Sequence, residues 1–135
     1  MKLEPFLLAN SLRLVLAQRL MRRLCAHCSE QTPLPLKVVT EYKLTREQID
    51  VAHHRVAKGC SRCMKTGYRG RVAVYESIVP NREIGDILRQ GGDEQELRKA
   101  AEAMNVVWMY EAGIARALAG ETTFDEVQRV LVREQ

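Results

Sequence analysis

The most informative pattern in the sequence spans Arg22–Cys28, Arg-Arg-Leu-Cys-Ala-His-Cys, and Gly59–Cys63, Gly-Cys-Ser-Arg-Cys. It contains two C-x-x-C pairs, Cys25 with Cys28 and Cys60 with Cys63, separated by thirty-one residues. Two-residue spacing lets both thiolates of a pair point inward, and two pairs complete a tetrahedral sulfur shell. Four soft sulfur ligands favour structural zinc over a cluster or a catalytic metal. The sequence therefore predicts a zinc site at these four cysteines, with a redox pair or unrelated cysteines as the alternatives.

No catalytic constellation accompanies the cysteines. His27, His53 and His54 are expected to face solvent or to support the ligands, because four paired cysteines already complete a ligand set. The 135 residues contain no G-x-S-x-G, H-E-x-x-H or G-x-x-x-x-G-K-[ST] motif. We therefore predict no catalytic residue and no cofactor-binding residue in this chain.

The segments around the cysteine pairs predict a mixture of helices and strands. Residues 72–78 alternate as a strand after a turn at residues 67–70, and Pro80 ends it. Between the pairs, a loop broken by Pro33 and Pro35 precedes a helix. This helix is predicted from Thr45 to Lys58, because Thr45 and Gln48 form a capping box and Gly59 suits the residue after a helix. The apolar spacing of residues 14–24 favours another helix.

The last third of the sequence predicts four short helices that form one compact cap. Asn81, Asp93 and Thr123 are suitable N-cap residues, and the latter two are each followed by Glu three positions later. Trp108, with the two residues that follow it, is expected in the core. At the other end of the chain, Pro5 begins a short helix that reaches Leu12.

Composition and charge limit the functional class. Hydrophobic residues make up 46% and charged residues 28% of a 15.4 kDa chain, which excludes a disordered protein. No apolar run is long enough to cross a membrane, and Glu4 and Arg13 interrupt the region where a signal peptide would lie, so we expect an intracellular protein. Residues 1–75 carry a net charge of +9 and residues 76–135 carry −5. A basic half suits nucleic acid, anionic lipid or an acidic protein face.

Several blocks resemble the hexameric ATPases of the type II secretion and type IV pilus assembly family. Residues 4–12, EPFLLANSL, and 15–28, VLAQRLMRRLCAHC, are similar to the segment that follows the catalytic core in that family. Residues 59–76, with Gly-Cys-x-x-Cys and Val-Tyr-Glu, resemble the distal half of the family's tetracysteine module. Residues 119–127, AGETTFDEV, resemble its terminal helix. The resemblance covers essentially the whole chain.

The resemblance implies an α+β fold: a β-hairpin edge of a RecA-like ATPase domain, with a zinc module inserted at its tip and a C-terminal helical cap. Residues 1–24 and 64–135 then belong to the ATPase domain, and residues 25–63 form the module. On this basis residues 14–24 are predicted as a strand, against their helical spacing. Residues 29–59 are expected to contact the C-terminal third little, so that deletion of the module is tolerated.

The implied function is that of a zinc-stapled C-terminal fragment of a motor ATPase that powers type II secretion or type IV pilus assembly. The fragment should be inactive alone, with ATP and magnesium bound only by the full-length parent. Implied partners are other ring subunits, inner-membrane platform proteins and anionic lipid, on the cytoplasmic face of the inner membrane. Secretion, pilus and competence systems stay open.

The alternative function is a free-standing basic zinc module that binds nucleic acid. It is suggested by six arginines near the cysteines, Arg19, Arg22, Arg23, Arg62, Arg69 and Arg71. Only Tyr42, Tyr68 and Tyr75 are aromatic in this region, which is too few for a stacking platform. Nucleic acid is therefore the less favoured partner.

Overall fold

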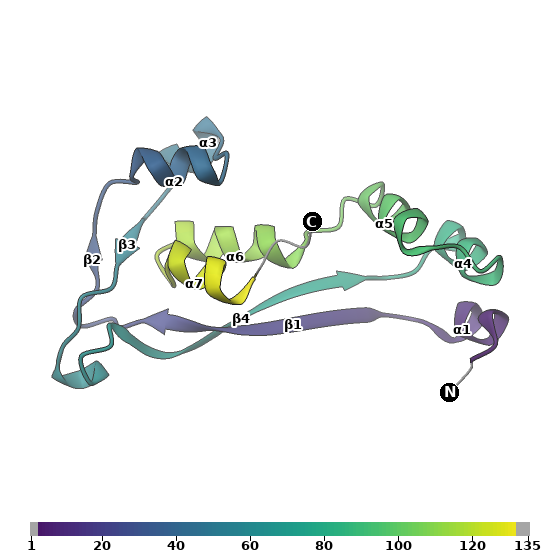
Figure 1. The fold of residues 1–135 in the computed structure, drawn as a ribbon, viewed down its shortest axis with the longest axis horizontal. Coiled ribbons are helices and arrows are strands. Elements are labelled where there is room, and N and C mark those ends of the chain that lie inside the picture. Colours follow the sequence, from purple (N-terminus) through teal and green to yellow (C-terminus); the bar gives the residue numbers. More distant parts are fainter. Residues whose placement is uncertain (1–2, 132–135) are drawn as a thin grey trace. The chain divides into compact units, whose positions relative to one another are not determined.

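The computed structural model describes residues 3–131 and confirms the α+β class (Figure 1). By contact the chain divides into two compact units. Of the described residues, unit 1 comprises 3–17 and 75–108, and unit 2 comprises 18–74 and 109–131. The elements in order are α1 Pro5–Ser11, β1 Val15–Leu24, β2 Glu30–Gln31, α2 Leu36–Glu41, α3 Arg46–Asp50, β3 Arg55–Val56, a 3-10 turn Ser61–Cys63, β4 Tyr68–Ile78, α4 Arg82–Arg89, α5 Glu94–Glu102, α6 Met109–Leu118 and α7 Phe124–Val130.

The long strands β1 and β4 pair in a two-stranded sheet, and their arrows in Figure 1 point in opposite directions. The strand prediction for residues 14–24 is therefore confirmed, and the helical spacing of their apolar residues is misleading. Pairing with β4 supplies the backbone hydrogen bonds that a helix would otherwise provide, so tertiary context decides the structure. The described residues contain no helix long and apolar enough to span a membrane.

The core of unit 2 forms where α6 and α7 cover this sheet. Met21, Val72 and Val74 point into it from the strands, as the two-residue period of β4 requires for Val72 and Val74. The buried residues that meet them are Ile114, Ala117, Leu118, Phe124, Val127 and Leu131. Each fully buried aliphatic or aromatic side chain contributes about 1.5 to 3 kcal/mol, so these nine residues dominate the stability of the unit.

The segment between the cysteine pairs packs on this same core, which makes the expectation of few contacts wrong. The Tyr42 ring lies 4.8 Å from the Phe124 ring, centroid to centroid, and its hydroxyl donates to the Phe124 carbonyl at 3.1 Å. Burial raises the pKa of Tyr42 to about 12. The His53 amide donates to the Leu118 carbonyl at 2.7 Å. Further apolar residues of the segment that pack against the core are Leu34, Val38, Leu44 and Ala52.

Inside this segment the helix prediction is correct at its start and wrong at its end. Thr45 and Gln48 form the predicted capping box, but α3 ends at Asp50. The chain then turns into β3, which pairs antiparallel with β2 in the register Glu30 to Val56 and Gln31 to Arg55. The Thr32 amide donates to the His54 carbonyl at 3.0 Å, so a long-range pairing replaces the last helical turns. Gly59, with φ +119°, follows a strand and not a helix.

Helix α2 is missing from the sequence prediction, because Pro33 and Pro35 just before it are interpreted there as breaking the chain into a loop. Pro35 occupies its N-cap, where an absent amide costs nothing because the first helical amides have no intrahelical partner. Proline therefore marks where this helix begins and does not exclude it.

Unit 1 contains α1, α4 and α5 together with residues 15–17 of β1 and 75–78 of β4. The caps predicted at Asn81 and Asp93 are confirmed, since their side chains accept from the amides of Ile84 and Glu96. Ile84, Ala100 and Ala101 are buried here. Because α4 and α5 fall in unit 1 and α6 and α7 in unit 2, the prediction of one compact helical cap is wrong.

A buried carboxylate fastens α7 to β1 in unit 2. Glu126 is 1% exposed and accepts from the Arg22 amide at 2.9 Å, from the Arg22 guanidinium at 2.7 and 2.9 Å, and from Arg129 at 2.6 and 2.9 Å. The Arg22 guanidinium also lies 4.2 Å from the centre of the Tyr68 ring. Burial raises the pKa of Glu126, but the hydrogen bonds from Arg129 and Arg22 outweigh it and hold the pKa at about 2.

This lowered pKa predicts an acid-sensitive contribution to stability. A carboxyl whose pKa falls on folding stabilises the protein above its unfolded pKa, and that contribution is lost as the pH drops from about 4.5 towards 2. Glu126→Gln should lower the free energy of unfolding near pH 7 by about 2 kcal/mol and flatten its dependence between these pH values. Urea unfolding at several pH values measures this. Glu41→Gln, an exposed change in the same unit, is the control, and equal acid sensitivity of both variants would contradict the assignment.

Candidate metal centre

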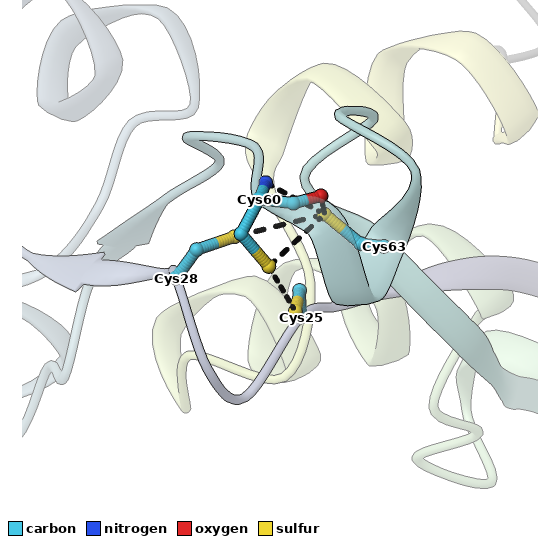
Figure 2. A group of neighbouring side chains, drawn as sticks. All are labelled: Cys25, Cys28, Cys60 and Cys63. Atoms are coloured by element: carbon cyan, nitrogen blue, oxygen red, sulfur yellow. Dashed lines mark hydrogen bonds between the residues drawn. The ribbon is translucent and has the colours of Figure 1, made fainter.

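The four predicted cysteines converge on one point in unit 2 (Figure 2). Cys25 and Cys28 follow β1. Cys60 is the N-cap of the 3-10 turn before β4, and Cys63 is the last residue of that turn. All four sulfur atoms lie within 4.8 Å of one another. The separations are 3.8 Å for Cys25 to Cys60, 3.8 Å for Cys28 to Cys63 and 3.7 Å for Cys60 to Cys63.

These separations fit a tetrahedral metal ion better than any disulfide. Zinc–sulfur bonds of about 2.3 Å give a tetrahedron whose edges are about 3.8 Å. A disulfide requires about 2.05 Å between sulfurs, and all four cysteines are free thiols. The group can therefore hold a metal ion, and sulfur ligands favour a soft or borderline cation.

Backbone amides aimed at the sulfurs prepare the site for negative charge. Gly59 donates to the Cys28 sulfur at 3.3 Å, and Cys60 and Gly67 each donate to the Cys63 sulfur at 3.2 Å. Burial raises the pKa of Cys63, but these two amides outweigh it and lower the pKa to about 6. The His27 amide is the main cause of a lowered pKa at Cys25.

The Cys28 thiol shows why a bound cation would stabilise the group. The Gly59 amide lowers the pKa of Cys28, but burial and the surrounding sulfurs of Cys25, Cys63 and Cys60 raise it to about 11. Crowded thiolates repel one another, so the last proton is hard to remove. A divalent cation among the sulfurs would offset that repulsion.

Two glycines allow the loops to close around the sulfurs. Gly59 has φ +119°, and a Cβ there would lie 2.8 Å from the Lys65 carbonyl oxygen. Gly67 has φ +84°, and a Cβ there would lie 2.7 Å from the Ala57 Cβ. Both conformations and both close approaches exclude larger residues. The glycines next to the second cysteine pair are therefore part of the site's architecture.

Residues near the cysteine cluster in sequence hydrogen-bond to the segment between α6 and α7. The Leu24 amide, just before Cys25, donates to the Glu121 carbonyl at 3.0 Å. The hydroxyl groups of Tyr68 and Thr123 lie 2.8 Å apart, and the Thr122 hydroxyl donates to the Arg22 carbonyl at 2.7 Å. These hydrogen bonds hold the strand ends that flank the cysteines against the segment that joins the two core helices.

The three histidines lie outside the group of candidate ligands found among the described residues. His27 is exposed and contacts Arg62, and His53 is exposed. His54 is buried, and its Nδ1 lies 3.0 Å from the Thr32 hydroxyl. No sequence pattern predicts this structural role of His54, because it depends on the pairing of β2 with β3.

Gly120 offers a test of how closely the segment between the cysteine pairs packs against the turn after α6. Its φ is +79°, and a Cβ there would lie 2.5 Å from the His53 carbonyl oxygen. Gly70 has φ +80° and nothing within 4 Å of such a Cβ. We expect Gly70→Ala to cost about 1 kcal/mol for backbone strain alone, and Gly120→Ala to cost clearly more. Urea unfolding compares them, and equal costs would contradict the close contact.

The comparisons with known proteins identify the family. The family model described as "Type II/IV secretion system protein" matches residues 1–129. The chain therefore belongs to the type II/IV secretion system protein family.

Curated relatives agree. The chain is 41% identical to the type II secretion system protein HxcR of Pseudomonas aeruginosa, over 96% of the chain and 24% of that protein. It is 34% identical to a putative type II secretion system protein E of Escherichia coli, over 96% of the chain and 26% of the relative. It is 35% identical to the type IV pilus assembly ATPase PilB of Thermus thermophilus, over 94% of the chain and 14% of that ATPase. The chain thus spans about a quarter or less of these relatives' lengths.

Proposed function

We propose that Cys25, Cys28, Cys60 and Cys63 hold one structural zinc ion. The sulfur separations near 3.8 Å, the three amide donors and the absence of a carboxylate or histidine from the group support zinc. Bound there, the ion would supply cross-linking and charge compensation, with no open coordination position for chemistry. The cysteines would fix the ends of the inserted segment against the turn between α6 and α7.

The same proposal assigns the chain to the C-terminal part of a hexameric motor ATPase that powers type II secretion or type IV pilus assembly. Residues 1–24 and 64–135 would belong to its ATPase domain, and residues 25–63 to a zinc module inserted in it. The observation that carries this is the family match over residues 1–129 together with a metal-ready cysteine cluster. The chain itself would be non-catalytic, and the longer protein would bind ATP and magnesium.

Exposed apolar side chains in both units support a larger parent domain. Phe6, Leu7 and Leu16 of unit 1 are 53%, 51% and 55% exposed, and Leu20 of unit 2 is 47% exposed. Isolated soluble domains rarely leave extended apolar surface uncovered. Covering partners would be the rest of the ATPase domain, neighbouring ring subunits and inner-membrane platform proteins, on the cytoplasmic face of the inner membrane.

The nucleic-acid alternative gains nothing from the structure. Tyr42 is engaged with Phe124, and the Tyr68 ring is covered by Arg22. Neither ring is free to stack on a base, which leaves Tyr75 as the single exposed candidate of the three. We therefore keep the ATPase assignment.

A chimera tests the proposed function. The matching segment of the Pseudomonas aeruginosa relative would be replaced by residues 1–130 of this chain, in cells that lack the native protein. We expect the chimera to restore type II secretion and the Cys63→Ser chimera to fail, with Ser61→Ala as the matched control. A stable, zinc-containing chimera that does not support secretion would contradict the assignment.

A further inference from the structure

A shallow depression that contains two arginines lies beside the cysteine cluster, between the end of β1, β3 and the turn after α6. Its volume is about 320 Å³. All of its lining belongs to unit 2: Arg23, Leu24, Ala26, Ser29, Arg55, Gly120 and Glu121. Two arginines from segments distant in sequence, Arg23 and Arg55, thus line one small space.

The Arg55 guanidinium is held in place by neutral groups. Its Nε donates to the Ser29 hydroxyl at 3.0 Å, and Nη2 donates to the Ser29 carbonyl at 2.7 Å. Its stem packs on Gly120, where a Cβ would lie 2.9 Å from Cδ. A side chain fixed in this way loses little further conformational entropy when it binds a ligand.

The charge of the depression is not balanced within the described part of the chain. Neither Arg23 nor Arg55 forms an ion pair there. Glu121 is the one carboxylate in the lining, and it is already paired with Arg116 at 2.8 Å. A half-buried guanidinium without a counter-charge is unfavourable, because burial weakens its hydration. This argument applies to Arg55, which is half-buried, and the exposed Arg23 adds a second positive charge without a carboxylate partner.

We propose that Arg23 and Arg55 form a binding site for a phosphoryl group, carried by a free phosphate or by a lipid headgroup. A phosphate dianion matches the two unpaired positive charges, whereas a carboxylate balances one. Its tetrahedral oxygens can accept from two guanidinium groups that approach from different directions, and arginine forks suit phosphate geometry. The site is independent of the assignment to an ATPase, because it uses only residues of this unit.

Inorganic phosphate tests the site directly. The zinc-loaded, 15N-labelled chain would be titrated with phosphate at constant ionic strength, with amide shifts followed by NMR. We expect saturable shifts centred on Arg23, Ala26 and Arg55. Arg23→Gln, an exposed change, and Arg55→Gln should each raise the dissociation constant about tenfold or more, since each removes charge-assisted hydrogen bonds. Arg69→Gln removes the same charge outside the depression and should leave binding unchanged at physiological salt.

Three outcomes would overturn the proposal: no saturable shift, equal weakening by Arg69→Gln, or equally tight binding of acetate at the same residues. Vesicles distinguish the source of the phosphoryl group. The lipid probe is an equimolar mixture of phosphatidylcholine and phosphatidic acid, because the phosphatidic acid headgroup is a phosphomonoester like inorganic phosphate. If these vesicles bind the chain with the same dependence on Arg23 and Arg55, the ligand is a lipid headgroup. If only inorganic phosphate shows that dependence, the ligand is a free phosphate. Zinc content and circular dichroism of each variant confirm that the fold is retained.

Discussion

Cys63→Ser is expected to abolish zinc binding and to leave unit 2 without cooperative folding. Cys63 is buried and receives two amide hydrogen bonds, so its sulfur organises the 3-10 turn and the start of β4 together. Structural zinc contributes about 10 kcal/mol or more to folding in small modules, whereas whole domains are stable by about 5 to 15 kcal/mol. Loss of one ligand should therefore remove most of the stability of this unit.

Ser61→Ala is the matched control, because Ser61 lies in the same turn with an exposed side chain. Zinc content and urea unfolding of the reduced proteins should show loss of the metal and of the cooperative unfolding transition for Cys63→Ser alone. A Cys63→Ser protein that unfolds with the wild-type midpoint would contradict a structural role for the cysteines.

Deletion of residues 25–63, the segment between the cysteine pairs with its four cysteines, should be the second most damaging change to the folding of unit 2. If a short Asn-Gly turn replaces Cys25 through Cys63, the Tyr42 contact with Phe124 and the bond from His53 to Leu118 disappear. The core face of α6 and α7 then becomes exposed, and we expect an expanded state with retained helix and lost tertiary packing. Strong binding of an apolar dye and the absence of a cooperative urea transition would show this. A cooperative transition with dispersed amide signals from α6 and α7 would contradict it.

Two point variants test the packing of this segment without the disruption that a large deletion causes. Tyr42→Ala removes the ring that packs on Phe124 and Tyr110, and should cost about 3 kcal/mol. Leu36→Ala changes a residue of the same segment that is 80% exposed, and should cost about 0.5 kcal/mol or less.

Local signals in the sequence predict local structure well. The caps at Thr45, Asn81, Asp93 and Thr123 all form, because a capping side chain contacts an amide only three residues away. The end of α3 could not be predicted, since it depends on the pairing of Thr32 with His54 across twenty-two residues. Residues 14–24 form a strand for a similar reason, and only the family resemblance indicated it.

The candidate site divides in the same way. Cysteine spacing predicts which four side chains converge, because C-x-x-C geometry is local and two pairs complete one shell. The docking of Tyr42 on Phe124, eighty-two residues away, leaves no mark in the spacing of apolar residues. The Arg55 contact with Ser29 depends on strands of two residues each, too short for any periodicity to reveal.

One zinc ion at Cys25, Cys28, Cys60 and Cys63 is proposed to hold the segment between the cysteine pairs against α6 and α7. Elemental analysis of the reduced, undegraded chain tests it most directly. We expect one zinc per chain, retained after gel filtration and lost together with cooperative unfolding when a strong chelator is added. A metal content near zero in protein that still unfolds cooperatively would contradict it.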